Sequence, residues 1–436
     1  MNEKIKTDVL IAGGGMAGVF GALAAARQGM RVMLVEPANV LGGQGTAGGV
    51  AGFCGDTLHV NDAFAELVDE LTQMNAIAPY SPRADRRDYD LELCSFVLQQ
   101  MVRNAGIQVL LHSRVMDVTV QDGRITHATV LCGSDRLSVD VEMVIDATGS
   151  CVLARQAGLA VEHLGANEQL PMSLYFTMWD TGKPITPHLP NGSPTWEGDD
   201  DLPMTTLHCF DSGKVEIKMK VIGFDAASGI SMSNAELHAR QQMMGLIYYL
   251  QTKGYHGKVL DQHILASVSR QIGVREECRI IGEHILTEEQ VKNATQFEDA
   301  IAVGTYHLDY HWPDKVQRAG TGITTMVKPY QIPLRSLIPR GAKNMLVPGR
   351  GASGDQMAMS SFRVMATCAQ MGFAAGMAAS AAIKESSDIS NVCIKTLQQQ
   401  LISHGQQLDL SAYGDYLNHL IEGQSAVHDG QSSNGH

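Results

Sequence analysis

DVLIAGGGMAGVFGALAAARQGMRVMLVEP, residues 8–37, carries the strongest structural signal in this chain of 436 residues. The segment predicts a short apolar strand (Val9–Ala12), a glycine-rich turn, an alanine-rich helix and a second strand (Arg31–Val35) that ends at Glu36. The order strand, glycine turn, helix and strand is that of a dinucleotide-binding βαβ unit. The first forty residues therefore predict the start of a nucleotide-binding domain.

The glycines of this turn have the spacing Gly13-x-Gly15-x-x-Gly18. The first glycine permits a tight turn, the second lets the backbone approach a pyrophosphate, and the third lets the helix pack closely on the strand. The helix N-terminus offers free N–H groups and a partial positive charge to the phosphates. Glu36, about 20 residues further on, is placed to accept hydrogen bonds from ribose hydroxyls. A dinucleotide is therefore the expected ligand.

Composition narrows the class of protein. Hydrophobic residues make up 44% of the chain and charged residues 18%, which is typical of a globular enzyme of two or three domains. The net charge of −13 argues against nucleic acid as a partner, because phosphates need a basic surface. None of the eight cysteines forms a CxxC pair or another close metal-type cluster, so we expect no metal and a reducing compartment. The N-terminus runs almost at once into the first strand and leaves no room for a signal peptide, so a cytoplasmic location is expected.

One segment has the length of a membrane span. Val364–Ile383 has no charged residue and contains the spacing Gly372-x-x-x-Gly376. It is rich in alanine and carries Thr, Ser and Gln, so it is less apolar than a span built from Leu, Ile and Val. We therefore expect a close-packed internal helix and no membrane span.

The rest of the chain contains further segments that predict strands and helices. Two alternating strands, Ser113–Val120 and Arg124–Leu131, flank an Asp-Gly turn, which is a strong hairpin signal. Val141–Ala147 reads as a buried strand. After a middle section of hairpins and helices, Asn344–Pro348 predicts another strand, and the segment Gly349–Asp355 leads into a long helix rich in Ala and Met.

These features together resemble the flavoprotein superfamily with the glutathione-reductase-type FAD fold. The resemblance rests on the N-terminal fingerprint with Glu36, the strand end Ile145–Gly149 and the late Gly354-Asp355 corner. Finer motifs resemble the FAD-dependent oxidoreductase family, and the likeness spans roughly residues 8–384. These motifs are Leu41–Thr46 (LGGQGT), Arg275–Glu283 (REECRIIGE), Ile332–Pro339 (IPLRSLIP) and Gly349–Cys368, which joins Gly-Arg to SFRVMATC.

The resemblance implies FAD as the cofactor and an α/β fold, with a split Rossmann-like FAD-binding domain and an inserted α+β substrate domain. The expected parts are residues 1–160 and 335–385 for the FAD-binding domain, 161–334 for the inserted substrate or cap domain, and 386–436 for a helical segment with a disordered tail from Gly423. A helix that starts near Gln356 would direct its positive end at the flavin pyrimidine ring.

The resemblance also implies a set of FAD-binding positions, most of them small residues. These are Gly13, Gly15, Met16, Ala17 and Gly18 around the pyrophosphate, Glu36 at the adenosine ribose, Gly42, Gly43 and Thr46 on the flavin side, the backbone of Val115 at adenine, Gly149 at the phosphates, and Gly354 with Asp355 at the ribityl or phosphate region.

Candidate catalytic residues come from two short patterns. In His307-x-Asp309-x-His311 the side chains share one face if the segment is a strand. An acid/base role for His307 first, or for His311, competes with structural histidines and with a less favoured metal site. Arg275 and Arg279 could bind a substrate carboxylate, or they could pair with neighbouring glutamates in the interior.

Two absences shape the expected reaction. The region after Glu36 offers only Cys54 where disulfide reductases of this fold carry a redox cysteine pair, and no second glycine fingerprint predicts an NAD(P)H domain. We expect an FAD-dependent dehydrogenase or oxidase that moves a hydride from a C–H bond of a small organic substrate to flavin N5. The alternatives are an NAD(P)H-dependent flavin monooxygenase and an FAD-binding electron-transfer subunit of a complex, and the chain could form a homo-oligomer.

Overall fold

The computed structural model describes residues 4–80, 86–210, 212–317, 322–414 and 416. In these residues a seven-stranded sheet has the order β5-β2-β1-β8-β7-β6, with β19 also beside β8. β1, β2, β5, β8 and β19 pair in parallel, and β6 and β7 form an antiparallel extension. The strands are β1 (Lys4–Ala12), β2 (Val32–Val35), β5 (Gln108–Leu110), β6 (Ser113–Gln121), β7 (Arg124–Cys132), β8 (Asp135–Asp146) and β19 (Met345–Leu346).

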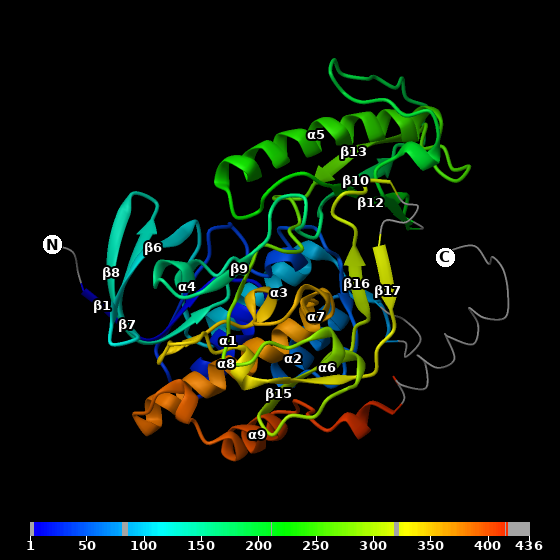
Figure 1. Cartoon of the computed structure of the whole chain (residues 1–436). Coiled ribbons are helices and arrows are strands. Elements are labelled where there is room, and N and C mark those ends of the chain that lie inside the picture. The colour runs from blue at the N-terminus through cyan, green and yellow to red at the C-terminus, as the bar shows by residue number, and fades with distance from the viewer. Residues whose placement is uncertain (1–3, 81–85, 211, 318–321, 415, 417–436) are drawn as a thin grey trace.

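This sheet confirms the predicted α/β class and the split of the parallel layer. The apolar run Val9–Ala12 is buried because β1 lies between β2 and β8, with helices against it. The last strand, β19, arrives some two hundred residues later and pairs with the end of β8. Two segments far apart in the sequence therefore build one sheet. In Figure 1 the orange helix α8, which follows β19 in the chain, lies beside the blue helix α1.

Two helices rich in small residues pack closely beside the sheet. They are α1 (Met16–Arg27) and α8 (Met365–Glu385). A side chain on Gly372 would overlap the carbonyl oxygen of Ala17, and one on Gly376 would overlap that of Gly21. α8 is long and apolar enough to cross a membrane by composition, but 89% of its apolar window is buried inside the protein. The small residues of Val364–Ile383 thus serve helix packing.

Further elements cover the same side of the sheet. α2 begins at Asn61, whose side chain accepts the Phe64 N–H at 2.9 Å, and α3 begins at Asp90, which caps it in the same way. Phe53 packs between Phe64 and Tyr89, with ring centroids 5.0 and 4.1 Å away. The bounds are α2 (Asp62–Gln73), α3 (Leu91–Asn104), β3 (Gly52–Cys54) and β4 (Arg86–Asp88). The short helix α4 (Val152–Gln156) packs on the opposite face of the sheet, in a second core that includes Leu10 and Val35.

A second, antiparallel sheet with one long helix forms a cap above this domain (Figure 1). Apolar side chains on one face of the sheet, such as Phe176 and Ile217, pack against α5 and make a separate core. The other face is polar, because the strands alternate between apolar and polar residues. The order is β11-β12-β10-β13, with β10 (Met172–Asp180), β11 (Thr205–Cys209), β12 (Lys214–Val221), β13 (His263–Val268) and α5 (Gly229–Thr252).

The chain after the cap returns to the first domain. Ile301, Tyr330 and Ile332 belong to the same hydrophobic core as α1 and α8. The boundary 161–334 for the inserted domain stays a prediction, and the separate core favours a narrower unit of about residues 172–274. The returning elements are β14 (Cys278–Ile280), α6 (Glu288–Lys292), β15 (Ala300–Gly304), β16 (Leu308–His311), β17 (Gly322–Thr325) and β18 (Tyr330–Pro333). The first of them, β14, pairs with β9 (Val161–His163), which precedes the cap.

The predicted long helix near the C-terminus is divided in two. α7 (Gln356–Phe362) ends at Arg363, and α8 starts after Val364, whose backbone is extended. Beyond α8, α9 (Ile394–Ser403) gives the expected helical segment, and the tail from Gly423 lies outside the described residues. Short 3-10 helices are η1 (Gly43–Gly45), η2 (Asp199–Asp201), η3 (Leu334–Ser336), η4 (Gly349–Gly351), η5 (Ile389–Asn391) and η6 (Leu410–Tyr413).

Candidate active site

The glycine-rich turn forms a cradle at the end of β1. Gly13 has φ +97°, and a side chain there would overlap the carbonyl oxygen of Ala147. A side chain on Gly18 would overlap the carbonyl oxygen of Gly13. Gly15 differs, because the nearest atom to an added Cβ is the Cα of Gly43 at 4.0 Å. Packing explains Gly13 and Gly18, whereas the open space at Gly15 fits close approach of a ligand phosphate.

Glu36 lies at the edge of this cradle. Its Oε2 accepts the Gly14 N–H at 2.5 Å, and its Oε1 accepts the Ala38 N–H at 2.7 Å. Burial raises the pKa of Glu36, although the two N–H donors oppose that shift. The backbone N–H of Ser113 donates to the Glu36 carbonyl at 3.0 Å, which places Val115 two residues further along β6. The carboxylate is therefore fixed at the tip of β2, with lone pairs left for ribose hydroxyls.

The loop after β2 is bonded to the glycine turn. Gly42, with φ +106°, donates its N–H to the Gly14 carbonyl at 2.8 Å, and Gly43 has φ +57°. The buried Thr46 hydroxyl donates to the Leu41 carbonyl at 2.6 Å. These bonds fix the loop against the cradle, so its backbone, and not the Thr46 hydroxyl, is available to a ligand.

The first turn of α1 completes the cradle. The Met16 methyl lies 3.0 Å from the position of a Cβ on Gly45, and the Ala17 Cβ lies 3.1 Å from that of a Cβ on Gly349. Opposite, Gly149 has φ +70°, and its carbonyl accepts the Nε–H of Arg350 at 3.0 Å. The expected positions Gly13–Gly18, Glu36, Gly42, Gly43 and Gly149 thus gather in one region, where the backbones approach closely and the missing side chain of Gly15 leaves open space.

The late corner differs from the prediction. Gly349 and Arg350, directly after β19, are the residues that touch the cradle. Gly354 instead accepts the Arg279 Nε–H at 3.0 Å, and both carboxylate oxygens of Asp355 accept backbone N–H groups, from Ala358 at 2.8 Å and Glu288 at 2.7 Å. Asp355 is therefore the N-cap of α7 and a clamp on α6, and its carboxylate has internal partners.

The helix that begins beside the cradle is α8. Its N-cap residue, Val364, has no side chain that accepts a hydrogen bond from the first turn. The first N–H groups and the positive end of the helix dipole are therefore not capped by that residue. Tyr89 Oη, which donates to the Gly45 carbonyl at 2.8 Å, lies 3.3 Å from the sulfur of Met365. The N-terminus of α8 thus lies beside the cradle, and the orientation of the Gln356 helix towards the flavin stays a prediction.

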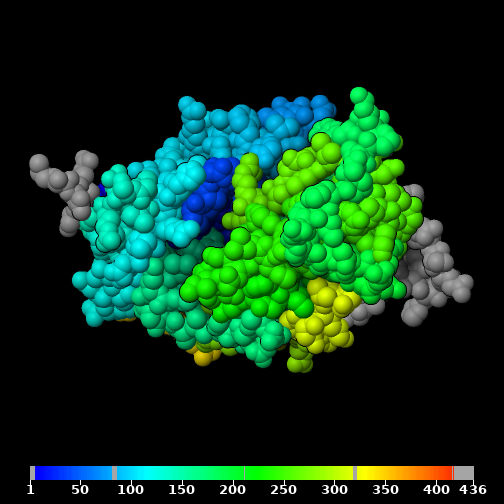
Figure 2. All heavy atoms as spheres, turned by 90° about the horizontal axis from the view of Figure 1, so that it is seen from above, coloured from blue at the N-terminus to red at the C-terminus, as the bar shows by residue number. Residues whose placement is uncertain are grey.

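The cap meets the first domain along the same loop. The Gln271 N–H donates to the Ala47 carbonyl at 3.1 Å, and a Cβ on Gly49 would lie 2.6 Å from the Cβ of Tyr175 on β10. The polar face of the cap sheet therefore covers the loop that leaves the cradle. Figure 2 shows a hollow between the cap and the β6–β7 hairpin, with N-terminal residues at its floor.

A group of charged side chains gathers where the cap and β16 meet. We call it the cationic cluster; its members are Arg86, Lys218, Arg275 and Arg363, with Asp309 and His311 among them. Arg363 Nη2 lies 3.0 Å from Asp309 Oδ2, and Asp309 Oδ1 lies 3.1 Å from His311 Nε2. Burial would raise the pKa of Asp309, but the His311 hydrogen bond and the Arg363 charge outweigh it and hold that pKa far below its usual range.

The two candidate histidines have different surroundings. Burial and the charge of Arg275 lower the pKa of His311 to about 4, since Arg363 already neutralises much of the Asp309 charge. His311 is thus a neutral imidazole at pH 7. His307 precedes β16, is half-buried, and has its ring centroid 3.9 Å from that of Tyr306. The structure therefore places His311 in the charged group, in contact with Asp309.

The two arginines named as possible substrate ligands also have different surroundings. Arg279 is 2% exposed and pairs with Glu276 and with Glu162 at 2.5 Å, which is the interior pairing that the sequence left as the alternative. Arg275 is half-buried, and its Nη1 donates to the Pro171 carbonyl at 2.8 Å and the Ser173 hydroxyl at 2.6 Å. Only Arg275 is free to meet a ligand.

Several members of the cluster escaped sequence analysis. Lys218 stands opposite Tyr175 in the cap sheet, and Arg86 lies on β4 and pairs with Asp88. A signal for Lys218 existed, because KVEIKMKV of β12 places its charges at every second residue. Cys54 is not an activated thiol, because burial raises its pKa to about 11. Among the described residues no group of three or more His, Cys, Asp or Glu is arranged to hold a metal ion.

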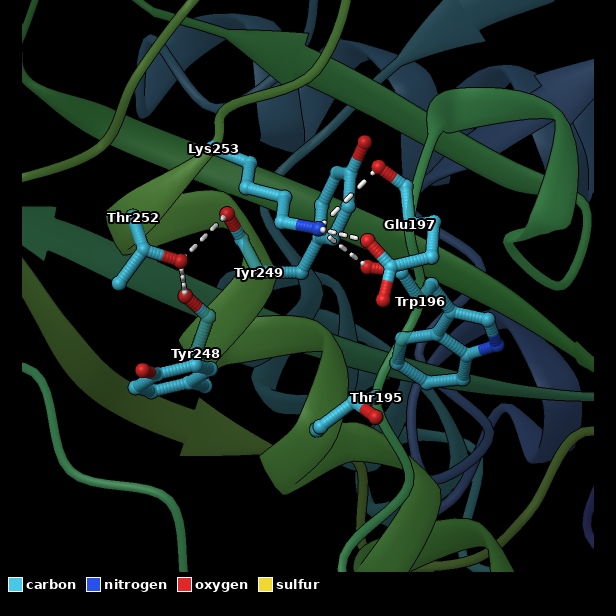
Figure 3. Close-up of a pocket in the computed structure, with 8 residues that line it drawn as sticks. Thr195, Trp196, Glu197, Tyr248, Tyr249, Thr252 and Lys253 are labelled. Carbon is cyan, nitrogen blue, oxygen red and sulfur yellow. Dashed lines mark hydrogen bonds and ion pairs between the residues drawn. The ribbon is translucent and has the colours of Figure 1, made fainter.

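A separate pocket of about 240 Å³ lies on the cap, at the end of α5 (Figure 3). Lys253 crosses it and donates to the Trp196 carbonyl at 2.9 Å and to Glu197 Oε2 at 3.1 Å. Tyr248, Tyr249 and Thr252 form its other wall. The Lys253 ammonium is fully occupied by these partners, and none of the expected FAD or catalytic positions lines the pocket.

Comparison with known proteins agrees with the cradle. The model of a family described as FAD dependent oxidoreductase matches residues 8–401. A geranylgeranyl bacteriochlorophyll reductase-like protein from Thermoplasma acidophilum is similar in structure, with TM-score 0.54, 14% identity, and coverage of 97% of this chain and 88% of that chain. CmlS, a flavin-dependent halogenase, has TM-score 0.51 and 13% identity over 92% of this chain and 63% of that chain.

No curated protein sequence matches the chain. At identities of 13–14% the two solved structures show a shared fold and nothing finer. The family match, in contrast, spans nearly the whole chain from the first strand to α9, and it includes every residue of the cradle. The chain therefore belongs to the FAD-dependent oxidoreductase family, with FAD as its cofactor.

Proposed function

We propose that this protein is a dehydrogenase or oxidase for a small organic substrate, with FAD bound in the manner of the glutathione-reductase-type fold. When bound, FAD supplies the hydride acceptor, N5 of its isoalloxazine ring. The single observation that carries the proposal is the His311–Asp309 pair, in which His311 is buried. The polar face of the cap reaches it, since Lys220 on β12 donates to the carbonyl of Trp312, the residue after His311, at 2.8 Å. A hydride donor that loses an O–H or N–H proton needs a base at such a place.

His311 is suited to take that proton. Its Nε2–H donates to Asp309 Oδ1 at 3.1 Å, which leaves Nδ1 as the acceptor of the neutral ring. Asp309 fixes the orientation of the imidazole, and Arg363 holds Asp309 in turn at 3.0 Å. A pKa of about 4 makes the free imidazole a weak base, so the site gains basicity when a bound ligand offsets the charge of Arg275.

The test is anaerobic bleaching of the flavin by a library of small metabolites. The purified protein should be yellow, and a matching substrate should remove its absorbance near 450 nm, roughly the flavin maximum. His311→Gln should keep FAD bound and slow bleaching by about 10²–10⁴-fold, the usual worth of a general base. The matched control is His307→Gln, which should bleach at the wild-type rate. If His311→Gln bleaches at the wild-type rate and His307→Gln bleaches slowly, the base is His307 and the assignment to His311 is wrong.

The same assay separates the other reactions of this fold. Rapid bleaching by NADPH alone would identify a monooxygenase, and a stoichiometric partner that purifies with the chain would identify an electron-transfer subunit. The described residues give neither reaction an observation of its own, so the hydride-transfer proposal stands first.

A further inference from the structure

The charges of the cationic cluster do not balance. Arg86 pairs with Asp88, and Arg363 pairs with Asp309. For Lys218 and Arg275, in contrast, no carboxylate partner is found within the described part of the chain. The bonds of Arg275 go to neutral acceptors, the Pro171 carbonyl and the Ser173 hydroxyl. These two half-buried cations thus share only the nearby charge of Asp309, which already pairs with Arg363.

These two cations belong to the same surface. Lys218 on β12 pairs in register with Tyr175 on β10, and Ser173, which binds Arg275, points to the same face two residues earlier. The loop at Gly49 lies directly against Tyr175. Lys218 and Arg275 therefore stand on the polar underside of the cap, where it covers the loop from the FAD cradle.

Unused hydrogen-bond donors point to the same chemistry. Arg363 is 8% exposed, and its Nη1 is buried with no hydrogen-bond acceptor among the described residues. Arg275 donates through Nη1 only, so the edge formed by Nε and Nη2 has no partner in the described part of the chain. A guanidinium edge of two parallel N–H groups matches the two oxygens of a carboxylate. Buried donors without acceptors are costly, and a ligand with anionic oxygens relieves that cost.

We propose that the substrate of this site is an organic carboxylate, bound by Arg275 and Lys218 with the spare donor of Arg363. This assignment rests on the proposed function and specifies its substrate class. It also supports the role of His311, because burial and the charge of Arg275 together lower the pKa of the imidazole, and a carboxylate beside Arg275 offsets the second of these causes. An acid whose oxidisable C–H bond is next to a hydroxyl or amino group fits both the cations and the base.

The test uses binding rather than turnover. The FAD-loaded protein is titrated with benzoate and, separately, with benzamide, which has nearly the same shape without the charge, and the flavin absorbance change gives Kd. We expect saturable binding of benzoate and at least tenfold weaker binding of benzamide. Lys218→Gln should weaken benzoate binding by about 10-fold or more, since a charge-assisted hydrogen bond is lost, and Lys218→Arg should restore most of it.

The matched control is Lys214→Gln. Lys214 stands on the same strand about 13 Å away, four residues at roughly 3.3 Å each, and pairs with Glu216 at 2.7 Å. Its loss should change the Kd of benzoate by less than twofold. Equal binding of benzoate and benzamide, equal effects of the two lysine variants, or sulfate bound as tightly as benzoate would each overturn the carboxylate assignment.

The two proposals fail in different ways. If benzoate binds as expected but no metabolite bleaches the flavin, the carboxylate site stands and the hydride-transfer function is wrong. If a neutral alcohol or amine bleaches the flavin rapidly and carboxylates neither bind nor compete, the function stands and the carboxylate assignment is wrong. If Lys218→Gln changes the flavin reduction potential but not the Kd of benzoate, the lysine serves the cofactor, and the assignment is again overturned.

Discussion

The FAD cradle and the cationic cluster are built from different kinds of chemical group. The cradle consists of closely packed backbone with a space at Gly15, and its turn, loop and carboxylate are bonded to one another. The cluster consists of long charged side chains from the cap, β4, β16 and the end of α7, some of whose donors have no partner in the described residues. The cradle can therefore select its ligand by shape, whereas the cluster selects by charge.

The largest effect on stability should come from removing the anion at the centre of the cluster. Asp309→Asn leaves the buried Arg363 without its ion partner. Breaking a buried pair costs about 3–5 kcal/mol, and because Asp309 is 23% exposed we expect the lower end, about 3 kcal/mol. Urea unfolding of the FAD-loaded protein measures this change.

The control for that variant is Glu92→Gln, which breaks an arginine pair at the surface. Glu92 is 70% exposed and binds Arg270 at 2.7 Å, so its loss should cost at most about 1 kcal/mol. A similar, small cost for both variants would mean that the cluster is open to water, and the contrast between the two regions would disappear.

The next effect distinguishes the two kinds of glycine within the cradle. Gly18→Ala forces a side chain into the Gly13 carbonyl and should destabilise the protein by about 1–3 kcal/mol even without FAD. Gly15→Ala meets no protein atom closer than 4.0 Å, so it should cost the FAD-free protein under about 1 kcal/mol. It should nevertheless weaken FAD binding at least about tenfold, because the pyrophosphate needs that space. Thermal unfolding of the FAD-free protein and an FAD titration separate these outcomes.

Gly229→Ala serves as the control for both glycine variants, because Gly229 begins α5 and no atom lies within 4 Å of an added Cβ. It should leave stability and FAD affinity intact. Tight FAD binding by Gly15→Ala would show that the cradle selects its ligand by something other than the space at this glycine.

The last effect concerns pH. The folded protein holds His311 neutral down to about pH 4, whereas the unfolded chain protonates it below its usual pKa of 6.5. Unfolding thus takes up a proton in this interval, so the free energy of unfolding is fully retained above pH 6.5 and falls as the pH decreases towards 4. Urea titrations between pH 4 and 7 should show a shallower pH slope for His311→Gln than for the wild type. Equal slopes would mean that His311 is exposed to water and does not belong to a closed cluster.

The cradle could be predicted because the residues that form it lie close together in the sequence. Gly13, Gly18 and Glu36 lie within one βαβ unit, and each has a conformational or bonding requirement that few residues meet. The strand, turn and helix around them follow the same pattern, so sequence and structure agree closely there. The packed helix α8 could be predicted for a similar reason, since its glycines and alanines are contiguous.

The rest depends on contacts that no local pattern encodes. Gly354-Asp355 resembled the corner at the cofactor, yet β19 ends earlier, so Gly349 and Arg350 reach the cradle first. His307 and His311 have the same alternation in the sequence, and only the position of Arg363, at the break between α7 and α8, distinguishes them. Lys218 joins the cationic cluster only because its cap strand folds over a loop near the N-terminus.

The close contact of α8 with α1 has a consequence for biosynthesis. The carbonyls of Ala17 and Gly21 are covered by glycines close to the other end of the chain, so the N-terminal βαβ unit leaves the ribosome with one side of its helix bare. The cradle is complete only after Gly349 and Arg350, which touch it, have been made. A nascent chain stopped before Gly372 would expose apolar surface and depend on chaperones, however complete its glycine turn.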